Sequence, residues 1–183
     1  ETIPISGNLD HFWKDMLELE ENGEIIKTRF GTYGLPEKMG LVVGRFQLTS
    51  KGFGFVIPDN KGERPDVFIP PRALGGAMNN DRVMARVESS SGGNKPEGEI
   101  IRIITHANNK IVGIFHQSGD FGFVTPDDKR IGQDIYIMKR HFGGAKTNQK
   151  VVAEITEWPV ERRNAEGKII EILGNVGDVG LEI

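Results

Sequence analysis

The chain has no cysteine, which excludes both a disulfide framework and a metal site built from thiolates. It also lacks a long apolar run, since no stretch approaches the roughly 18 residues that a membrane-spanning helix needs. No secretory signal is recognisable at the start, so we expect a cytoplasmic protein with no membrane partner. The first residue, Glu1, is not a methionine and indicates a fragment of a longer protein.

A strong charge of one sign is missing too, because the net charge is only −3. Residues 1–36 carry three basic and seven acidic side chains, residues 37–112 carry 11 and eight, and residues 113–183 carry nine and 11. Only the middle segment has a basic excess. Binding to phosphates would therefore come from local patches rather than from the field of the whole chain.

Residues that perform catalysis or bind metals are few and scattered. The four histidines are His11, His106, His116 and His141. Their positions lack the spacing of metal ligands. Asp59, Asp127 and Asp128 follow prolines, where aspartate is ordinary turn chemistry. We therefore expect no catalytic residue and no metal site in this chain, and no hydrolysis by this chain alone.

What the sequence does contain is an internal repeat. Phe-Gly-Phe-Val at 53–56 and Asp-Val-Phe-Ile at 66–69 return, 68 residues later, as Phe-Gly-Phe-Val at 121–124 and Asp-Ile-Tyr-Ile at 134–137. A repeat of this length predicts two tandem domains rather than the units of one solenoid. Domains this small bury a modest share of their surface, so packing against each other would help both.

Each copy shows about five short strands separated by turn residues, the pattern of a closed β-barrel. We predict strands at 41–48, 52–57, 66–69, 82–87 and 97–104, and again at 110–116, 121–125, 134–137, 150–156 and 166–173. A serine- and glycine-rich loop, 89–94, precedes the last strand of the first copy.

The segment before the repeat has its own pattern. Apolar residues between Leu9 and Leu17 recur at helical spacing, with Asn8 as the N-cap and Gly23 as the stop. Strands at 25–29 and 33–35 would form a hairpin around Gly31-Thr32. This order is typical of the last part of a winged-helix domain; the alternative is a small accessory element packed on the first barrel.

Alternation along the strands points to an aromatic outer surface. Phe53 and Phe55 share one strand face, whereas the neighbouring strand has Val67 and Ile69 on one face and Phe68 on the other. Because a small barrel has one interior, the two β-branched residues point inward and Phe68 points outward. Apolar side chains on both faces indicate an outer face that is covered or binds a ligand.

Phe53, Phe55 and Phe68 are called the first aromatic face below. Stacking on exposed rings contributes roughly 1–3 kcal/mol per base with any base, so we predict a site for single-stranded nucleic acid with little sequence preference. The glycines beside these rings, Gly52 and Gly54, favour this interpretation, since a missing side chain lets a flat base approach closely. The alternative is that the phenylalanines simply form the barrel core.

The second copy repeats these rings as Phe121, Phe123 and Tyr136, the second aromatic face, with His116 near its start. Asp120 stands beside this face, in the turn where the first copy has Lys51 next to its glycine, and a carboxylate there repels phosphate. We therefore expect the first barrel to grip nucleic acid and the second mainly to position it. The alternative is that the second face packs against a neighbouring domain.

Lysines and arginines around both faces are candidate phosphate contacts. They are Arg45, Lys51, Arg64, Arg72 and Arg82 in the first copy, and Lys129, Arg130, Lys139, Arg140 and Lys146 in the second. Lys51 is the strongest of them because it adjoins the aromatic strand.

The segments 51–56 and 67–69 resemble the paired ribonucleoprotein motifs of cold-shock domains, which are OB-type barrels that bind single-stranded nucleic acid. The tryptophan expected on the first strand is replaced by Gln47-Leu48, and the histidine expected after the second motif is replaced by Pro70. Two copies after a helix and hairpin resemble the N-terminal region of the bacterial ribonuclease R family. The segments similar to that family in order and spacing are 33–36, 66–71, 121–128 and 166–174.

This resemblance implies a mainly β fold with two tandem five-stranded OB-type (cold-shock) barrels, preceded by a helix and a β-hairpin. The implied domains are a partial winged-helix element (1–36), the two barrels (37–110 and 111–176) and the start of a linker to a catalytic domain (177–183).

The resemblance also implies a function: a monomeric region that captures single-stranded RNA for a hydrolytic 3′-to-5′ exoribonuclease. Mg²⁺ would be bound by the parent enzyme and no cofactor by this chain. Two alternatives stay open. The first is a non-enzymatic RNA chaperone, and the second is a set of barrels that contact another protein or the ribosome.

Overall fold

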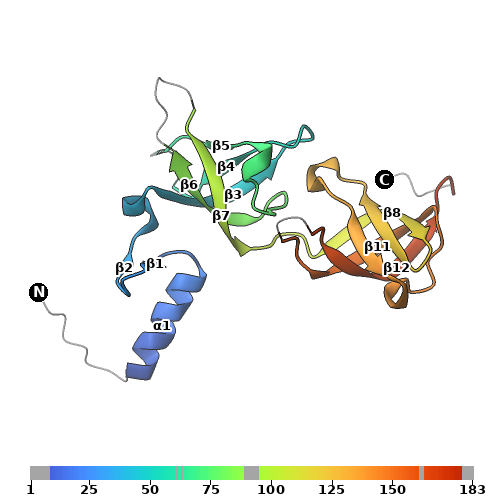
Figure 1. Cartoon of the computed structure of the whole chain (residues 1–183), viewed down its shortest axis with the longest axis horizontal. Coiled ribbons are helices and arrows are strands. Elements are labelled where there is room, and N and C mark those ends of the chain that lie inside the picture. Colours follow the sequence, from blue (N-terminus) through green and yellow to red (C-terminus); the bar gives the residue numbers. More distant parts are fainter. Residues whose placement is uncertain (1–8, 61, 63, 89–94, 161–162, 179–183) are drawn as a thin grey trace, which may run out of the picture.

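The structure is a computed structural model that describes residues 9–60, 62, 64–88, 95–160 and 163–178. Two closed five-stranded barrels follow one helix and a short hairpin, so the predicted mainly β fold class is confirmed. Figure 1 shows the barrels side by side along the long axis of the molecule, with the helix on the side of the first barrel away from the second. The predicted N-cap Asn8, the loop 89–94 and most of the linker 177–183 lie outside the described residues.

The N-terminal elements are α1 (Leu9–Glu21), β1 (Ile26–Lys27), β2 (Tyr33–Gly34) and the 3-10 helix η1 (Pro36–Met39). Both hairpin strands are shorter than predicted. Among the described residues, no helix is long and apolar enough to cross a membrane.

The helix α1 is attached to the first barrel at its C-terminal end. Arg102 of the first barrel donates hydrogen bonds to the carbonyl oxygens of Glu20 and Glu21, at 2.8 and 2.9 Å. These carbonyls belong to the last helical turn, and that of Glu20 also accepts a hydrogen bond from the backbone N–H of Gly23 at 3.1 Å. The guanidinium adds to this cap and complements the helix dipole. Gly23 then adopts a φ of 73° and ends the helix, as predicted. These contacts attach the end of the helix to the first barrel, whereas α1 itself buries no residue.

The first barrel consists of β3 (Leu41–Leu48), β4 (Gly54–Pro58), β5 (Val67–Ile69), β6 (Arg82–Glu88) and β7 (Glu97–Thr105). The strand order is β3-β4-β5-β7-β6, and the ring closes between β6 and β3. The pair β5–β7 is parallel and the other pairs are antiparallel. Phe46 is fully buried at the centre of the core.

The second barrel consists of β8 (Lys110–Ser118), β9 (Phe121–Pro126), β10 (Ile135–Met138), β11 (Gln149–Glu157) and β12 (Glu166–Asn175). It has the same order of strands and the same parallel pair, here β10–β12. Phe115 takes the place of Phe46 in its core. All ten predicted barrel strands are confirmed, with ends that agree within two residues.

In each barrel, one glycine in the first strand allows that strand to pass close to the second strand of the same barrel. A side chain at Gly44 would collide with the backbone of Ile57, and one at Gly113 would collide with the backbone of Thr125. Glycine at these positions therefore permits two backbones to approach at a barrel corner.

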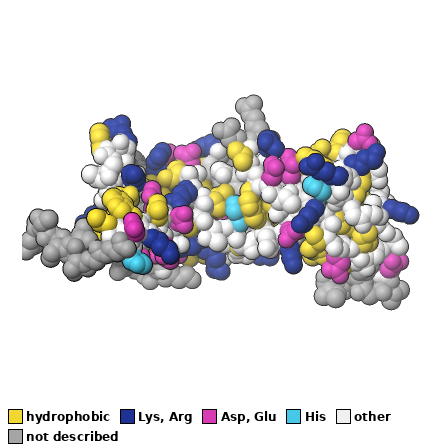
Figure 2. Space-filling model, turned by 90° about the horizontal axis from the view of Figure 1, so that it is seen from below, with side chains coloured by type: hydrophobic (Ala, Val, Ile, Leu, Met, Phe, Trp, Pro, Cys, Tyr) yellow, Lys and Arg dark blue, Asp and Glu magenta, His cyan; other side chains and the backbone are white. Residues whose placement is uncertain are grey.

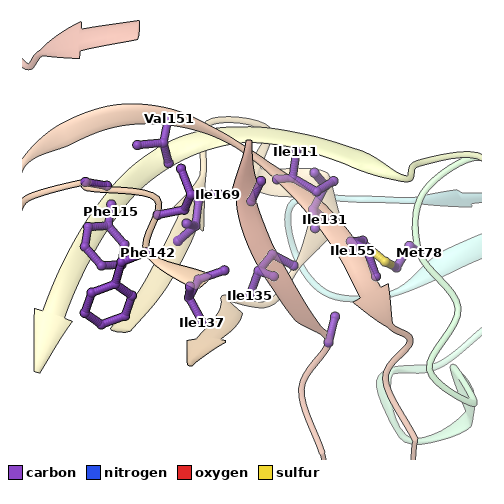
Figure 3. Close-up of a cluster of buried hydrophobic side chains, with 14 residues drawn as sticks. Met78, Ile111, Phe115, Ile131, Ile135, Ile137, Phe142, Val151, Ile155 and Ile169 are labelled. Atoms are coloured by element: carbon purple, nitrogen blue, oxygen red, sulfur yellow. The ribbon is translucent and has the colours of Figure 1, made fainter. Parts of the chain in front are cut away.

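The two barrels are joined by a packed junction. Met78, in the loop before β6, is fully buried and belongs to the core cluster of the second barrel rather than the first. Figure 3 shows its thioether beside Ile155 and Ile131. Met78 of the first barrel is therefore part of the hydrophobic core of the second barrel. The repeat does not reproduce this residue, since position 146 of the second copy is a lysine.

Polar contacts fix the connection between the barrels next to Met78. The carboxylate of the buried Asp81 accepts hydrogen bonds from the backbone N–H groups of Met78 (2.9 Å) and Ala107 (3.0 Å). It also contacts Nδ1 of His106 at 3.1 Å, and the His106 ring stacks on Trp158 with centroids 3.5 Å apart. The connection is therefore held by both barrels.

Candidate nucleic-acid interface

The first aromatic face lies on the outside of β4 and β5, as predicted. Val67 and Ile69 are buried in the core, whereas Phe68 is only partly buried and pairs with Phe55 across the two strands. Phe53, just before β4, completes the cluster, and the three ring centroids are 5.6–5.9 Å apart. The alternative that these rings form the barrel core is wrong, because the interior is filled by Phe46 and its neighbours.

The role expected for Gly54 is corrected by the structure. A side chain at this position would point inward and collide with the ring of Phe46. The equivalent glycine of the second barrel, Gly122, faces Phe115 in the same way. Gly54 therefore makes room for a core phenylalanine, and it is not required for the approach of a ligand from outside. Gly52 has a φ of 85° and serves the turn between β3 and β4.

Three basic side chains surround the first aromatic face. Arg45 points outward from β3, where it is the register partner of Ile57 on β4. Lys51 is exposed in the turn that leads into Phe53. The ammonium group of Lys95 lies 5.3 Å from the centroid of Phe55. Lys95 was not among the candidates, because it is 40 positions away from Phe55 in the sequence and no local pattern relates the two.

Several other candidate cations already contact acidic side chains. The ion pairs are Arg72–Glu97 (2.9 Å), Arg82–Asp59 (2.6 Å), Arg130–Asp128 (2.9 Å) and Lys139–Asp120 (2.6 Å). Figure 2 shows basic and acidic side chains interspersed on one face of the molecule rather than gathered in one basic field. This agrees with the prediction that attraction for phosphates is local.

The second aromatic face is a row across three strands. His116 on β8 pairs with Phe123 on β9, which pairs with Tyr136 on β10. The rings of His116 and Phe123 are 5.3 Å apart, and Phe121 stacks on Tyr136 at 5.6 Å. Phe121 is 41% exposed and Tyr136 is 36% exposed. Both rings are therefore accessible, and His116 belongs to the row as proposed.

Asp120, beside this second face, is paired. Its carboxylate accepts a hydrogen bond of 2.6 Å from the ammonium group of Lys139. This hydrogen bond, and then the positive charge of Lys139, lowers the pKa of Asp120 from its ordinary value. The two charges cancel at neutral pH, so the repulsion of phosphate that we expected from Asp120 is offset by Lys139.

A hollow of about 500 Å³ lies where the two barrels meet. Lys51 and Gly52 line it from the first barrel, and Lys129, Gln133 and Asp134 line it from the second. Lys51 therefore lines a hollow that both barrels share, and it lies two positions before Phe53 of the first aromatic face. Asp134 lines the same hollow and lies two positions before Tyr136 of the second aromatic face. The arrangement can offer stacking surfaces on both barrels, with a cation in the hollow where the barrels meet.

The described residues contain no group of three or more histidine, aspartate or glutamate side chains that could hold a metal ion. Asp128 takes part in a turn, since its carboxylate accepts a hydrogen bond from the backbone N–H of Arg130 at 3.0 Å. A hydrogen bond from the Arg130 guanidinium is the main cause that lowers the pKa of Asp128. The described residues thus do not fit a magnesium site.

Comparison with known proteins agrees with this geometry. Residues 44–103 match the model of the ribonuclease B OB domain, and residues 123–183 match the model of a cold shock domain. Ribonuclease R of Thermotoga maritima is 35% identical over 169 residues, which are 91% of this chain and 23% of the relative. The chain is thus similar, over nearly its whole length, to one part of ribonuclease R. Ribonuclease R of Escherichia coli K12 is 31% identical over 165 residues, 90% of this chain and 20% of that protein.

Solved structures show the same fold. Ribonuclease R of Mycoplasma genitalium, solved in complex with ribose-methylated single-stranded RNA, has a TM-score of 0.66 and 19% identity, and the match covers 75% of this chain and 22% of that one. Yeast Ssd1, described as a pseudonuclease, has a TM-score of 0.63 and 14% identity over 78% of this chain and 24% of its own. The chain spans about a fifth to a quarter of the length of the ribonuclease R sequences from Thermotoga maritima and Escherichia coli.

Proposed function

We propose that this chain is the region of a 3′-to-5′ exoribonuclease that captures single-stranded RNA by aromatic stacking and guides it to a catalytic domain. The observation that carries the proposal is the first aromatic face: three phenylalanines gathered on the outside of a closed barrel, with Arg45, Lys51 and Lys95 around them. A barrel gains nothing from placing three large apolar rings on its outer side unless something covers them.

The chemistry of the face matches single-stranded RNA. Phe53, Phe55 and Phe68 offer π surfaces for bases, and the cations beside them are within reach of the phosphates that follow those bases. Similarity to ribonuclease R and to its RNA-bound structure from Mycoplasma genitalium supports RNA as the polymer. In this proposal catalysis and its Mg²⁺ belong to a domain outside this chain, as the resemblance to ribonuclease R implies.

The experiment is a binding titration with a fluorescent single-stranded RNA. Phe53→Ala combined with Phe68→Ala should weaken binding by on the order of 2–6 kcal/mol if both rings stack on bases. The matched control is Phe12→Ala with Phe30→Ala, since these phenylalanines are 37% and 78% exposed but lie on the N-terminal elements. Wild-type affinity of the first double variant, with unchanged circular dichroism, would contradict the proposal.

Salt dependence separates RNA binding from a purely structural role. Contacts to phosphates make the logarithm of the affinity fall with the logarithm of the salt concentration, by about 0.7 per phosphate on a single strand. A chain whose barrels serve only as contact surfaces for a protein or the ribosome would bind RNA weakly, with a slope near zero.

A second candidate function is a non-enzymatic RNA chaperone. It is favoured by the similarity in fold to a pseudonuclease, which shows that this arrangement of barrels occurs in a protein described as lacking nuclease function. The two candidates share the binding face and differ in their products. A chaperone opens a fluorescently labelled hairpin without shortening it, whereas the exoribonuclease that contains this region shortens it from the 3′ end.

The monomeric state and the cytoplasmic location also remain proposals. Gel filtration with light scattering tests the first, and cell fractionation tests the second.

A further inference from the structure

Both barrels contain the same group of three side chains on the outer face. The outward aromatic residue on the third strand has a glutamate as its partner on the parallel strand: Phe68 pairs with Glu97, and Tyr136 pairs with Glu166. Register partners on neighbouring strands project to the same side of the sheet, so each carboxylate stands beside a ring. The structure thus places an acidic side chain at the edge of each stacking surface.

An arginine contacts each of these glutamates, but it comes from a different segment in each barrel. Arg72 follows β5 and contacts Glu97 at 2.9 Å. Arg163 precedes β12 and contacts Glu166 at 2.8 Å. The same arrangement of charges is therefore built twice from unlike parts of the repeat. Surface ion pairs contribute little to stability, so a gain in stability does not explain why both barrels have this arginine–glutamate arrangement.

In the second barrel this group lines a hollow of about 610 Å³ on the outer face. Its apolar lining is Phe123, Tyr136 and Met138, and its polar lining is Asp134, Arg163, Asn164 and Glu166. The volume falls within the range of small-ligand sites. The polar lining has two carboxylates, one amide and one guanidinium, so carboxylate oxygens are its most numerous charged groups and make it rich in hydrogen-bond acceptors. Acceptors repel phosphate oxygens but attract the N–H groups on the edge of a base.

The carboxylate of Glu166 is the best placed acceptor. Its side chain is only 17% exposed, whereas that of Arg163 is 70% exposed. Arg163 contacts Oε1, and each oxygen of a carboxylate has two lone pairs, so the group retains capacity for further donors. A base stacked on Tyr136 would present its edge to this carboxylate, because Glu166 lies directly beside Tyr136 on the next strand.

Bases differ in what they offer to such an acceptor. Guanine presents an N–H and an amino group side by side, and adenine and cytosine each present one amino group. Uracil presents a single N–H between two carbonyl oxygens, which a carboxylate repels. Carboxylates are accordingly used by proteins to accept hydrogen bonds from base amino groups.

We infer that the hollow bounded by Tyr136 and Glu166 is a base-selective subsite that prefers bases with an exocyclic amino group, guanine above all, over uracil. The inference rests on the proposed RNA-binding function and deepens it. It makes the second barrel the one that discriminates between bases, whereas stacking on the first barrel tolerates any base.

The test uses RNA strands of roughly 12 nucleotides, within the span of one or two OB-type barrels. One strand contains only uridine, a second has one central guanosine, and a third has inosine in its place. Inosine lacks only the amino group of guanine. The strand can slide along the protein, so a single guanosine can reach the hollow. We expect guanosine to improve affinity by roughly 5- to 100-fold, and inosine to lose most of this gain.

Glu166→Gln should bring the ratio of guanosine to uridine affinity close to one. The matched control is Glu157→Gln, because Glu157 contacts the same Arg163, at 3.5 Å, but does not line the hollow. This control loses the same charge and should retain the preference for guanosine.

The outcomes separate the inference from the proposed function. If the uridine strand binds but guanosine gives no advantage, or if the advantage persists in Glu166→Gln, the inference is overturned and RNA binding stands. If inosine binds as well as guanosine, the amino group is not what the site recognises, and the inference is again overturned. If none of the strands binds, the proposed function itself fails.

Discussion

Met78→Ala tests whether the two barrels form one cooperative unit. The side chain is fully buried, and it lies in the core of the second barrel although it belongs to the first. Truncation of a buried methionine to alanine costs about 2–5 kcal/mol of unfolding free energy, through lost transfer energy and the cavity that remains. For a chain of this size, each kcal/mol lowers the unfolding midpoint by about 2–4 °C, so a decrease of several degrees is expected.

Trp158 provides a specific reporter of this junction. The chain has two tryptophans, so Trp13→Phe leaves Trp158 as the single fluorophore. Trp158 packs on the second core and stacks on His106. Because Met78 connects the barrels, thermal unfolding followed by Trp158 fluorescence and by far-ultraviolet circular dichroism should shift together in the Met78→Ala variant.

The control for this experiment is Met39→Ala, which removes the same atoms from a side chain that is 43% exposed. Surface substitutions of this kind usually change stability by less than about 0.5 kcal/mol. A Met78→Ala variant that loses no more than Met39→Ala would refute the reasoning. So would a large loss seen by circular dichroism that leaves the Trp158 signal unchanged.

The remaining predictions concern local contacts. Lys139→Ala should raise the pKa of Asp120 toward its ordinary value in a carboxyl NMR titration. Because the pKa of Asp120 is lowered in the folded state, the small stabilisation from this pair is present above the ordinary pKa of aspartate. It is lost as the pH falls through the lowered pKa of the folded state. An Asp120 titration that is unchanged in Lys139→Ala would contradict the pairing. Gly44→Ala should lower the unfolding free energy by at least about 1–3 kcal/mol, measured by urea denaturation, because the added methyl collides with the Ile57 backbone; a neutral effect would mean that β3 bends differently. Arg102→Ala should speed amide hydrogen exchange in α1 while the barrel strands exchange as before, since it removes the cap on Glu20 and Glu21; equal protection in both proteins would show that other contacts hold the helix.

Much of the fold follows from the sequence because its signals are local. The repeat fixes the number of barrels, and alternation along strands places Phe68 outward and Val67 inward without knowledge of any neighbour. The role predicted for Gly54 was wrong because a local signal does not show which residues lie across the sheet from it. A glycine beside an aromatic residue is compatible with contact on either face, and only the position of Phe46 shows which face requires it.

Parts of the candidate site depend on contacts between distant segments. Lys95 approaches Phe55, Lys139 pairs with Asp120, and Arg163 reaches Glu166 beside Tyr136. Lys95 and Arg163 precede the last strand of their barrels, and Lys139 follows the third strand of the second. The sequence around each of these residues does not identify its partner, because the periodicity of strands does not predict the direction of a side chain in a loop.

The sequence alone determined that this protein has two β-barrels of one design, each with aromatic rings on the outside, because strand period and turn residues act over a few neighbouring positions. The tertiary structure decided how the copies differ. Met78 enters the core of the other barrel, while its counterpart is Lys146, and the guanidinium beside each glutamate comes from unlike segments. Those differences arise where loops fold back on barrels, and only the closed barrels bring such residues together.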